Sequence, residues 1–313
     1  MTAFNRKETA EKLRNAVEIL SKNDSYSAIC HKHYIGEPSI SMEKLDMIVK
    51  KIREIIFPGF FDNNTLDPVA VHYYMGVYTD ELFDMLSEQI LAGLCFACKE
   101  RKDSELHLMD EMVYANDIAA DFISTLPEMR RILSTDVEAT FLGDPAAQSW
   151  SEVIFCYPTI KAISSYRIAH ALLGLKVPII PRIITEMAHS ETGIDIHPRA
   201  EIGESFSIDH GTGTVIGATC IIGKKVKLYQ GVTLGAKNFP MDENGNPIKG
   251  IPRHPIIEDN VVIYAQATIL GRVTIGHESV IGGNVWVTHD VPPNSTLVQF
   301  KPKWQQFADG AGI

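Results

Sequence analysis

The residues best placed to do chemistry are a histidine and an aspartate in the C-terminal half of the chain. His210 follows Asp209 in a glycine-rich run, and Asp195 lies fourteen residues before Asp209. On a coil with about eighteen residues a turn, both segments can lie on neighbouring turns, where Asp195 could reach the His210 ring. A carboxylate on one imidazole nitrogen fixes the tautomer and leaves the other nitrogen as a base. The spacing fits a turn histidine satisfied by a neighbouring acid equally well.

Two further groups of charged residues can recognise a substrate that carries both charges. Arg253 offers a planar guanidinium suited to a carboxylate, and His254 stands next to it. Asp144 and Asp209 can together bind an ammonium group. Plainer alternatives stay open, because Arg253 can be a surface cation in a loop and Asp144, which precedes a proline, can be a helix N-cap. The set favours an amino acid over a sugar, which offers no paired charges.

The sequence predicts no metal centre. A zinc enzyme built on a β-helix would need three imidazoles that converge on one ion. The histidines of the C-terminal half are well apart: His197, His210, His254, His277 and His289. Cys95 and Cys98 fall in an apolar helical run, so we interpret them as packed core thiols. The odd number of cysteines fits reduced thiols.

The elements that position most of these residues follow a six-residue rhythm between residues 193 and 300. Aliphatic residues recur at this spacing: Ile196, Ile202 and Ile208; Ile216, Ile222, Leu228 and Leu234; Ile257, Ile263, Ile269, Ile275, Ile281 and Val287. A fixed period of six is typical of a parallel β-helix, whereas an α-helix repeats its apolar face near 3.6 residues. With three rungs a turn, the stretch predicts about five turns.

The rhythm breaks twice, and each break carries a candidate site residue. Around His210, two successive aliphatic positions are eight residues apart in place of six. Later a loop is extruded over residues 236–252, and the chain returns to the repeat at Arg253. Insertions into a repeat tend to emerge on its binding face, so we expect both breaks to contribute to a site.

The preceding residues, 1–192, are predicted to form an all-helical domain, which makes the fold α+β. The helical pattern runs to about residue 126, and Thr135 with Glu138 forms a capping box that predicts the start of a second helical group. Within it, residues 136–192 form a connector that contributes Asp144. At the other end, the glycine-rich tail at 301–313 is predicted to be flexible.

Composition excludes several classes of partner. The chain has 313 residues and a formal net charge of −10, which argues against nucleic acid and anionic membranes. No apolar run is long enough to span a bilayer. The N-terminal residues lack the apolar core of a signal peptide, so we expect a cytoplasmic protein.

Six segments, taken in order, resemble the serine O-acetyltransferase family. They are Asp144-Pro145-Ala146-Ala147, Tyr166-Arg167-Ile168-Ala169-His170, Thr192-Gly193-Ile194-Asp195-Ile196-His197-Pro198, Asp209-His210-Gly211-Thr212-Gly213, Gln230-Gly231-Val232-Thr233-Leu234-Gly235 and Arg253-His254-Pro255. The resemblance covers about residues 140–298. It implies a left-handed β-helix, trimers that often pair into hexamers, acetyl-CoA as the acetyl donor and feedback inhibition by L-cysteine at the L-serine site.

The resemblance also implies roles for the candidate residues. His210 would take the proton of the serine hydroxyl as general base, and Asp195 would orient its ring. Arg253 and His254 would hold the serine carboxylate, and the two acids named above would hold the ammonium group.

The coenzyme and a protein partner complete these expectations. Acetyl-CoA would lie between neighbouring subunits, near Gly235, Ala236 and Ala265. In the family, a terminal isoleucine enters the active site of O-acetylserine sulfhydrylase, which implies the same role for Ile313.

Two other functions stay open from the sequence. The chain could acetylate another small acceptor, homoserine or a sugar, on the same coil. It could also be a non-enzymatic scaffold that docks through its tail. The paired charges favour an amino acid, and the Asp195 and His210 pair argues against a purely structural role.

Overall fold

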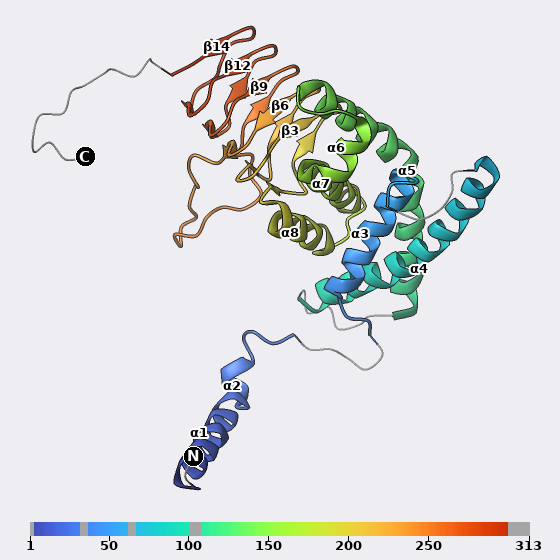
Figure 1. Ribbon diagram of the computed structural model, residues 1–313. Helices are drawn as coiled ribbons and strands as arrows, with labels where there is room; N and C mark the ends of the chain where they lie inside the picture. The colour runs from blue at the N-terminus through green and yellow to red at the C-terminus, as the bar shows by residue number, and fades with distance from the viewer. Residues whose placement is uncertain (1–2, 32–36, 62–66, 101–107, 300–313) are drawn as a thin grey trace, which may run out of the picture.

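The computed structural model describes residues 3–31, 37–61, 67–100 and 108–299, so the tail with Ile313 lies outside the described residues. The first part of the chain is helical, and the second is a coil of short strands (Figure 1). The helices are α1 (Ala3–Leu20), α2 (Asn23–Tyr26), α3 (Met42–Ile56), α4 (Pro68–Glu100), α5 (Leu108–Gly143), α6 (Trp150–Cys156), α7 (Pro158–Gly174) and α8 (Ile180–Thr192). None of these described helices is long and apolar enough to cross a membrane.

Helix α3 shows why these segments fold as packed helices. The Ser41 hydroxyl accepts the N–H of Lys44 at 3.2 Å and caps the first turn. Leu45, Ile48 and Ile52 then recur on one face and are fully buried. That face packs on α4 and α5, where Cys95 and Cys98 are also buried.

The predicted break between residues 126 and 135 is wrong. Helix α5 continues through Pro127 to Gly143, so Thr135 and Glu138 form no capping box. The Thr135 hydroxyl donates to the carbonyl of Ile132 and accepts the N–H of Ser205 at 2.9 Å. Packing of the buried residues on both sides of the proline outweighs its missing N–H, which is a tertiary effect that local signals do not carry.

The C-terminal half forms the predicted parallel coil of about five turns. Its strands are β1 (Asp195–Ile196), β2 (Glu201–Ile202), β3 (Ser207–Asp209), β4 (Val215–Ile216), β5 (Ile221–Ile222), β6 (Lys227–Tyr229), β7 (Thr233–Gly235), β8 (Ile256–Ile257), β9 (Val262–Ile263), β10 (Thr268–Leu270), β11 (Thr274–Ile275), β12 (Val280–Ile281), β13 (Trp286–Val287) and β14 (Thr296–Leu297). Every strand pairing between them is parallel, as a hexapeptide β-helix requires. The aliphatic positions of the rhythm face inward, because they stack in register and are buried, apart from Ile202, which is half-buried.

Three sheets form the faces of this coil, and three corners join them. Sheet A has the order β1-β4-β7-β10-β13, sheet B has β11-β8-β5-β2, and sheet C has β14-β12-β9-β6-β3. The chain passes from sheet A to B, from B to C and from C back to A. We call these passages the A–B, B–C and C–A corners. The loop predicted at 236–252 leaves between β7 and β8, at the A–B corner (Figure 1).

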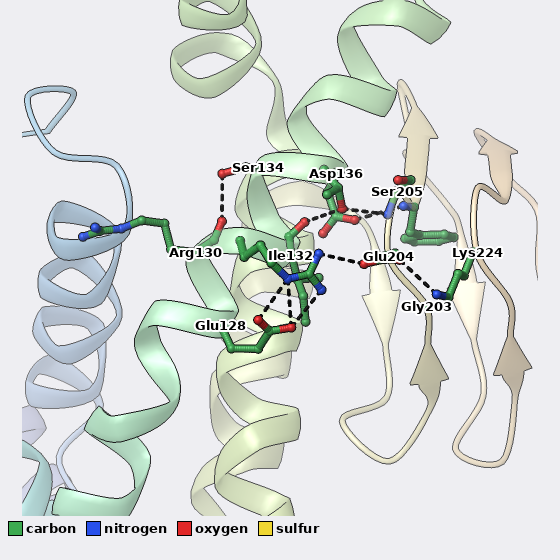
Figure 2. Close-up of polar contacts among 12 residues, drawn as sticks. Glu128, Arg130, Ile132, Ser134, Asp136, Gly203, Glu204, Ser205 and Lys224 are labelled. Carbon is green, nitrogen blue, oxygen red and sulfur yellow. Dashed lines mark hydrogen bonds and ion pairs between the residues drawn. The ribbon is translucent and has the colours of Figure 1, made fainter.

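Charged side chains join the helices to the coil on the exposed side of α5. Arg131 donates to Glu128 and, at 2.9 Å, to Glu204, whose carboxylate also accepts Lys224 at 3.0 Å. Figure 2 shows these contacts beside the turn that carries Gly203. Water and salt screen exposed ion pairs, so these contacts add little to the stability of this junction.

Candidate active site

His210 lies at the C–A corner, directly after β3. Its backbone is in the left-handed region, with φ of 56°, and two glycines with positive φ follow it, Gly211 and Gly213. These conformations absorb the two extra residues of the rhythm. The imidazole is 77% exposed, and its Nε2 lies 3.8 Å from Oδ1 of Asp209. The ring is therefore open to a substrate at this corner.

Asp195 lies on the neighbouring turn of the coil, as its spacing predicts. Its N–H donates to the carbonyl of Thr214 at 2.9 Å, four residues after His210. Within the described residues, however, no hydrogen bond joins the Asp195 carboxylate to the His210 ring. The carboxylate lies instead near Glu186 and His189, with ligand atoms of all three within 4.8 Å of one another.

The group around Asp195 is anchored in α8. The Glu186 carboxylate lies 3.5 Å from Nδ1 of His189 and pairs with the guanidinium of Arg182, which neutralises part of its negative charge. Helix α8 ends at Thr192, and Gly193 takes a left-handed conformation that leads directly into β1. Asp195 thus stands at the passage from the helices to the coil.

Asp144 caps a turn and not a helix. It follows the last residue of α5, and its Oδ1 accepts the N–H of Ala146 at 2.8 Å. The next helix, α6, begins at Trp150 with Ser149 as its cap, so the N-cap interpretation is wrong. The hydroxyl of Tyr157 donates to Oδ2 at 2.6 Å, and this bond lowers the pKa of the Asp144 carboxyl. The same bond raises the pKa of Tyr157 to about 12.

Asp144 and Asp209 line one small hollow, and Lys227 also lines it. The Lys227 ammonium group donates to the carbonyl of Gly143 at 2.6 Å and lies 3.5 Å from Oδ2 of Asp209. Sequence reasoning missed this residue. A signal existed, because Lys227 precedes the inward-facing Leu228 and must therefore point outward beside β3. The Lys227 ammonium group therefore lines the hollow next to Asp209 and the end of α5.

His254 lies at the A–B corner and is almost fully buried, with 7% of its surface exposed. Its Nδ1 accepts the N–H of Thr219 at 3.1 Å and lies 2.8 Å from the Thr219 hydroxyl. Burial, followed by the charges of Arg253 and Arg272, lowers the pKa of His254 to about 4. The ring is neutral near pH 7, and because Nδ1 accepts, its proton lies on Nε2. No hydrogen bond from Nε2 joins it to another of the described residues, so it can donate to a ligand. Gly217 makes room for the ring, which a Cβ there would overlap.

Arg253 faces a basic cavity of about 440 Å³ beside the extruded loop. His197, Arg199, Phe239 and Lys249 also line it. The buried Nε of Arg253 has no hydrogen-bond partner among the described residues. The cavity can therefore take an anion, with the Arg253 guanidinium as a ready donor.

The candidate residues fall on two different corners of the coil. Asp209 and His210 lie at the C–A corner with Asp144 beside them, whereas Arg253 and His254 lie at the A–B corner. The expected coenzyme residues divide in the same way, with Gly235 and Ala236 at the A–B corner and Ala265 at the C–A corner. Sheet A separates the two sets, so one subunit does not bring them together.

Comparisons with known proteins show which family the chain resembles. Residues 254–289 match the family model described as bacterial transferase hexapeptide (six repeats). A serine acetyltransferase of Synechococcus elongatus is 49% identical over 276 residues, which cover 88% of this chain and 86% of that protein. A serine acetyltransferase of Bacillus subtilis is 46% identical over 168 residues, which cover 54% of this chain and 73% of that protein.

Solved structures resemble the chain over a similar span. The crystal structure of Entamoeba histolytica serine acetyltransferase 1 in complex with L-cysteine has a TM-score of 0.69 and 32% identity. The structural match covers 91% of this chain and 94% of the Entamoeba histolytica chain. The structure of Neisseria gonorrhoeae serine acetyltransferase in complex with serine has a TM-score of 0.53 and 25% identity, and it covers 82% of this chain and 97% of that one.

Proposed function

The chain belongs to the serine acetyltransferase family, and we propose that it takes the acetyl group from acetyl-CoA at a site shared between two subunits. Acetyl transfer to the hydroxyl of L-serine, the step that leads to cysteine, is the activity of the family. The single observation that supports the shared site is the division of the candidate residues between two corners. A free amino acid carries both charges, and each corner offers the groups for one of them.

The proposed recognition follows from the contacts at each corner. The guanidinium of Arg253 and the Nε2–H of His254 would donate to the serine carboxylate. Asp144 and Asp209 would accept from the serine ammonium group. The hydroxyl of serine would then lie near the exposed ring of His210, which directly follows Asp209.

In the proposed chemical step, His210 takes the proton of the serine hydroxyl, and the serine oxygen forms a bond to the thioester carbon of acetyl-CoA. The carbon–sulfur bond then breaks, and the thiolate of CoA takes the proton from His210. Asp195 would orient the imidazole, although its carboxylate lies near Glu186 and His189 in this structure. Gly235, Ala236 and Ala265 would contact the coenzyme, and no metal ion takes part in the proposed step.

We propose a trimer as the assembly that joins the two corners. The three sheets give the coil a triangular cross-section, and closed cyclic symmetry is the common arrangement of identical subunits. Around a threefold axis, the C–A corner of one subunit can face the A–B corner of the next. Two trimers could pair further into a hexamer.

Release of CoA thiol tests the reaction directly. We expect L-serine to produce rapid thiol release from acetyl-CoA, with little release from homoserine or a sugar. Homoserine carries its hydroxyl one methylene further from the two charges, which moves it away from His210. Equal release with a sugar would contradict recognition through paired charges.

Arg253→Lys is expected to raise the KM for serine by about tenfold or more while the KM for acetyl-CoA stays within about twofold. Lysine keeps the charge but loses the planar fork that can hold a carboxylate through two bonds. Steady-state kinetics with each substrate varied in turn give both constants. Equal changes in both would show that Arg253 supports the extruded loop and does not bind serine.

L-cysteine is proposed as a feedback inhibitor that competes with serine, since it presents the same carboxylate and ammonium groups. The relative from Entamoeba histolytica was crystallised with L-cysteine. Purely non-competitive inhibition against serine would count against a shared pocket.

The partner proposed for Ile313 is O-acetylserine sulfhydrylase. This proposal rests on the family resemblance, since the tail lies outside the described residues. The test is to delete Ile313 and to titrate the protein against the sulfhydrylase. Binding as strong as that of the intact chain would contradict the proposal. A cytoplasmic location stays a prediction from the N-terminal composition.

A further inference from the structure

The two acids proposed to bind the serine ammonium group come from separate parts of the fold. Asp144 directly follows the last residue of α5, whereas Asp209 ends β3 of the coil. Their carboxylates line the same hollow. The spacing between them therefore depends on how firmly α5 is held against the turn that leads into β3.

A buried ion pair fixes this junction. Asp136 of α5 is fully buried, and its carboxylate accepts two bonds from the guanidinium of Arg167 in α7, at 2.6 and 2.9 Å. Oδ1 of Asp136 also accepts the backbone N–H of Phe206 at 2.9 Å. Figure 2 shows Asp136 directed at the turn that carries Gly203 and Ser205.

Arg167 completes the connection from the other side. Its Nη2 donates to the carbonyl of Gly203 at 2.8 Å, and its Nη1 donates to that of Ile202 at 3.3 Å. The guanidinium thus spans a helix and the backbone that leads into β3. Burial raises the pKa of the Asp136 carboxyl, and the charge of Arg167 acts in the opposite direction.

Only short segments of regular structure connect this ion pair to Asp144 and Asp209. Asp144 follows Asp136 by eight residues, about 12 Å along a helix at 1.5 Å a residue. Asp209 follows Phe206 by three residues, about 10 Å along an extended chain. A small tilt of α5 against the coil would change the distance between the two carboxylates.

We propose that the Asp136–Arg167 pair positions Asp144 and Asp209 for the serine ammonium group, and so sets the affinity for serine. The desolvation cost of burying two charges can exceed the energy of their attraction, so a buried ion pair is weak evidence for stability. Its bidentate geometry and its bonds to three backbone groups fix a relative orientation. This inference rests on the proposed roles of the two acids.

Asp136→Asn tests this positioning role. Asparagine keeps the side-chain volume but replaces one acceptor of the guanidinium with a donor. We expect the KM for serine to rise about tenfold, with the KM for acetyl-CoA within about twofold, and the inhibition constant of cysteine to rise in parallel. If that variant does not fold, Arg167→Lys keeps the charge, removes the bidentate contact and should give the same split. Equal changes in both KM values, or no change in either, would overturn the inference.

Glu204→Gln is the matched control, because Glu204 joins α5 to the same turn through exposed ion pairs. It should leave both KM values unchanged, and a serine-specific rise there would overturn the special role of the buried pair. Asp144→Asn separates this inference from the proposed function. If Asp144→Asn leaves the KM for serine unchanged, the proposed ammonium site is wrong. If it raises that KM and Asp136→Asn does not, the site stands and the positioning role fails.

Discussion

His210→Ala is expected to lower the turnover of serine acetylation by about 10²–10⁴-fold, the usual contribution of a general base. The ring is mostly exposed at the C–A corner, so its removal deletes the proton acceptor and little packing. The fold should therefore survive. Thiol release under saturating substrates measures the loss, and thermal unfolding followed by circular dichroism checks the fold.

Two further variants sharpen this result. Asp195→Asn should lose less turnover than His210→Ala, because the imidazole remains while the support for its tautomer changes. His277→Ala removes an exposed histidine at the B–C corner and should leave turnover unchanged. Full activity in His210→Ala would overturn the mechanism, since no other imidazole occupies that corner in the described part of the chain.

The coil could be predicted from the sequence because the aliphatic residues that form its core recur at a fixed short spacing. In sheet A, Ile196, Ile216, Leu234, Ile269 and Val287 stack in register, as the six-residue rhythm requires. The breaks in that rhythm also located the two corners that carry the candidate site. Each break is visible in the sequence as a change of spacing, without knowledge of what packs against it.

The contacts between the helices and the coil could not be predicted in this way. Thr135 looked like a cap, yet its hydroxyl accepts the N–H of a residue seventy positions later. Asp136 and Arg167 are thirty-one positions apart, and the family segment that contains Arg167 does not tell which residue it pairs with. Lys227 could be placed on the outer face, but only the end of α5 explains what it contacts. Such contacts depend on how two domains dock, and periodicity within each domain does not specify docking.

Mixed trimers are expected to regain activity that two inactive variants lack. One variant carries His210→Ala and keeps an intact A–B corner, and the other carries Arg253→Ala and keeps an intact C–A corner. In any trimer that contains both chains, one of the three subunit contacts joins the two intact corners. We therefore expect about one third of the wild-type activity in such trimers, given closed threefold symmetry.

Co-expression with two different affinity tags, followed by purification on both, isolates the mixed assemblies. Each variant expressed alone should show only residual activity, and light scattering should give the same mass for all preparations. A site built within one subunit predicts no recovery, because every chain in the mixture then carries a defect of its own. Mixed trimers as inactive as their parents would thus exclude the shared site, and an active monomer would exclude it as well. Recovery would instead show that the positive and negative halves of the serine site come from different subunits, because no single chain in the mixture holds both.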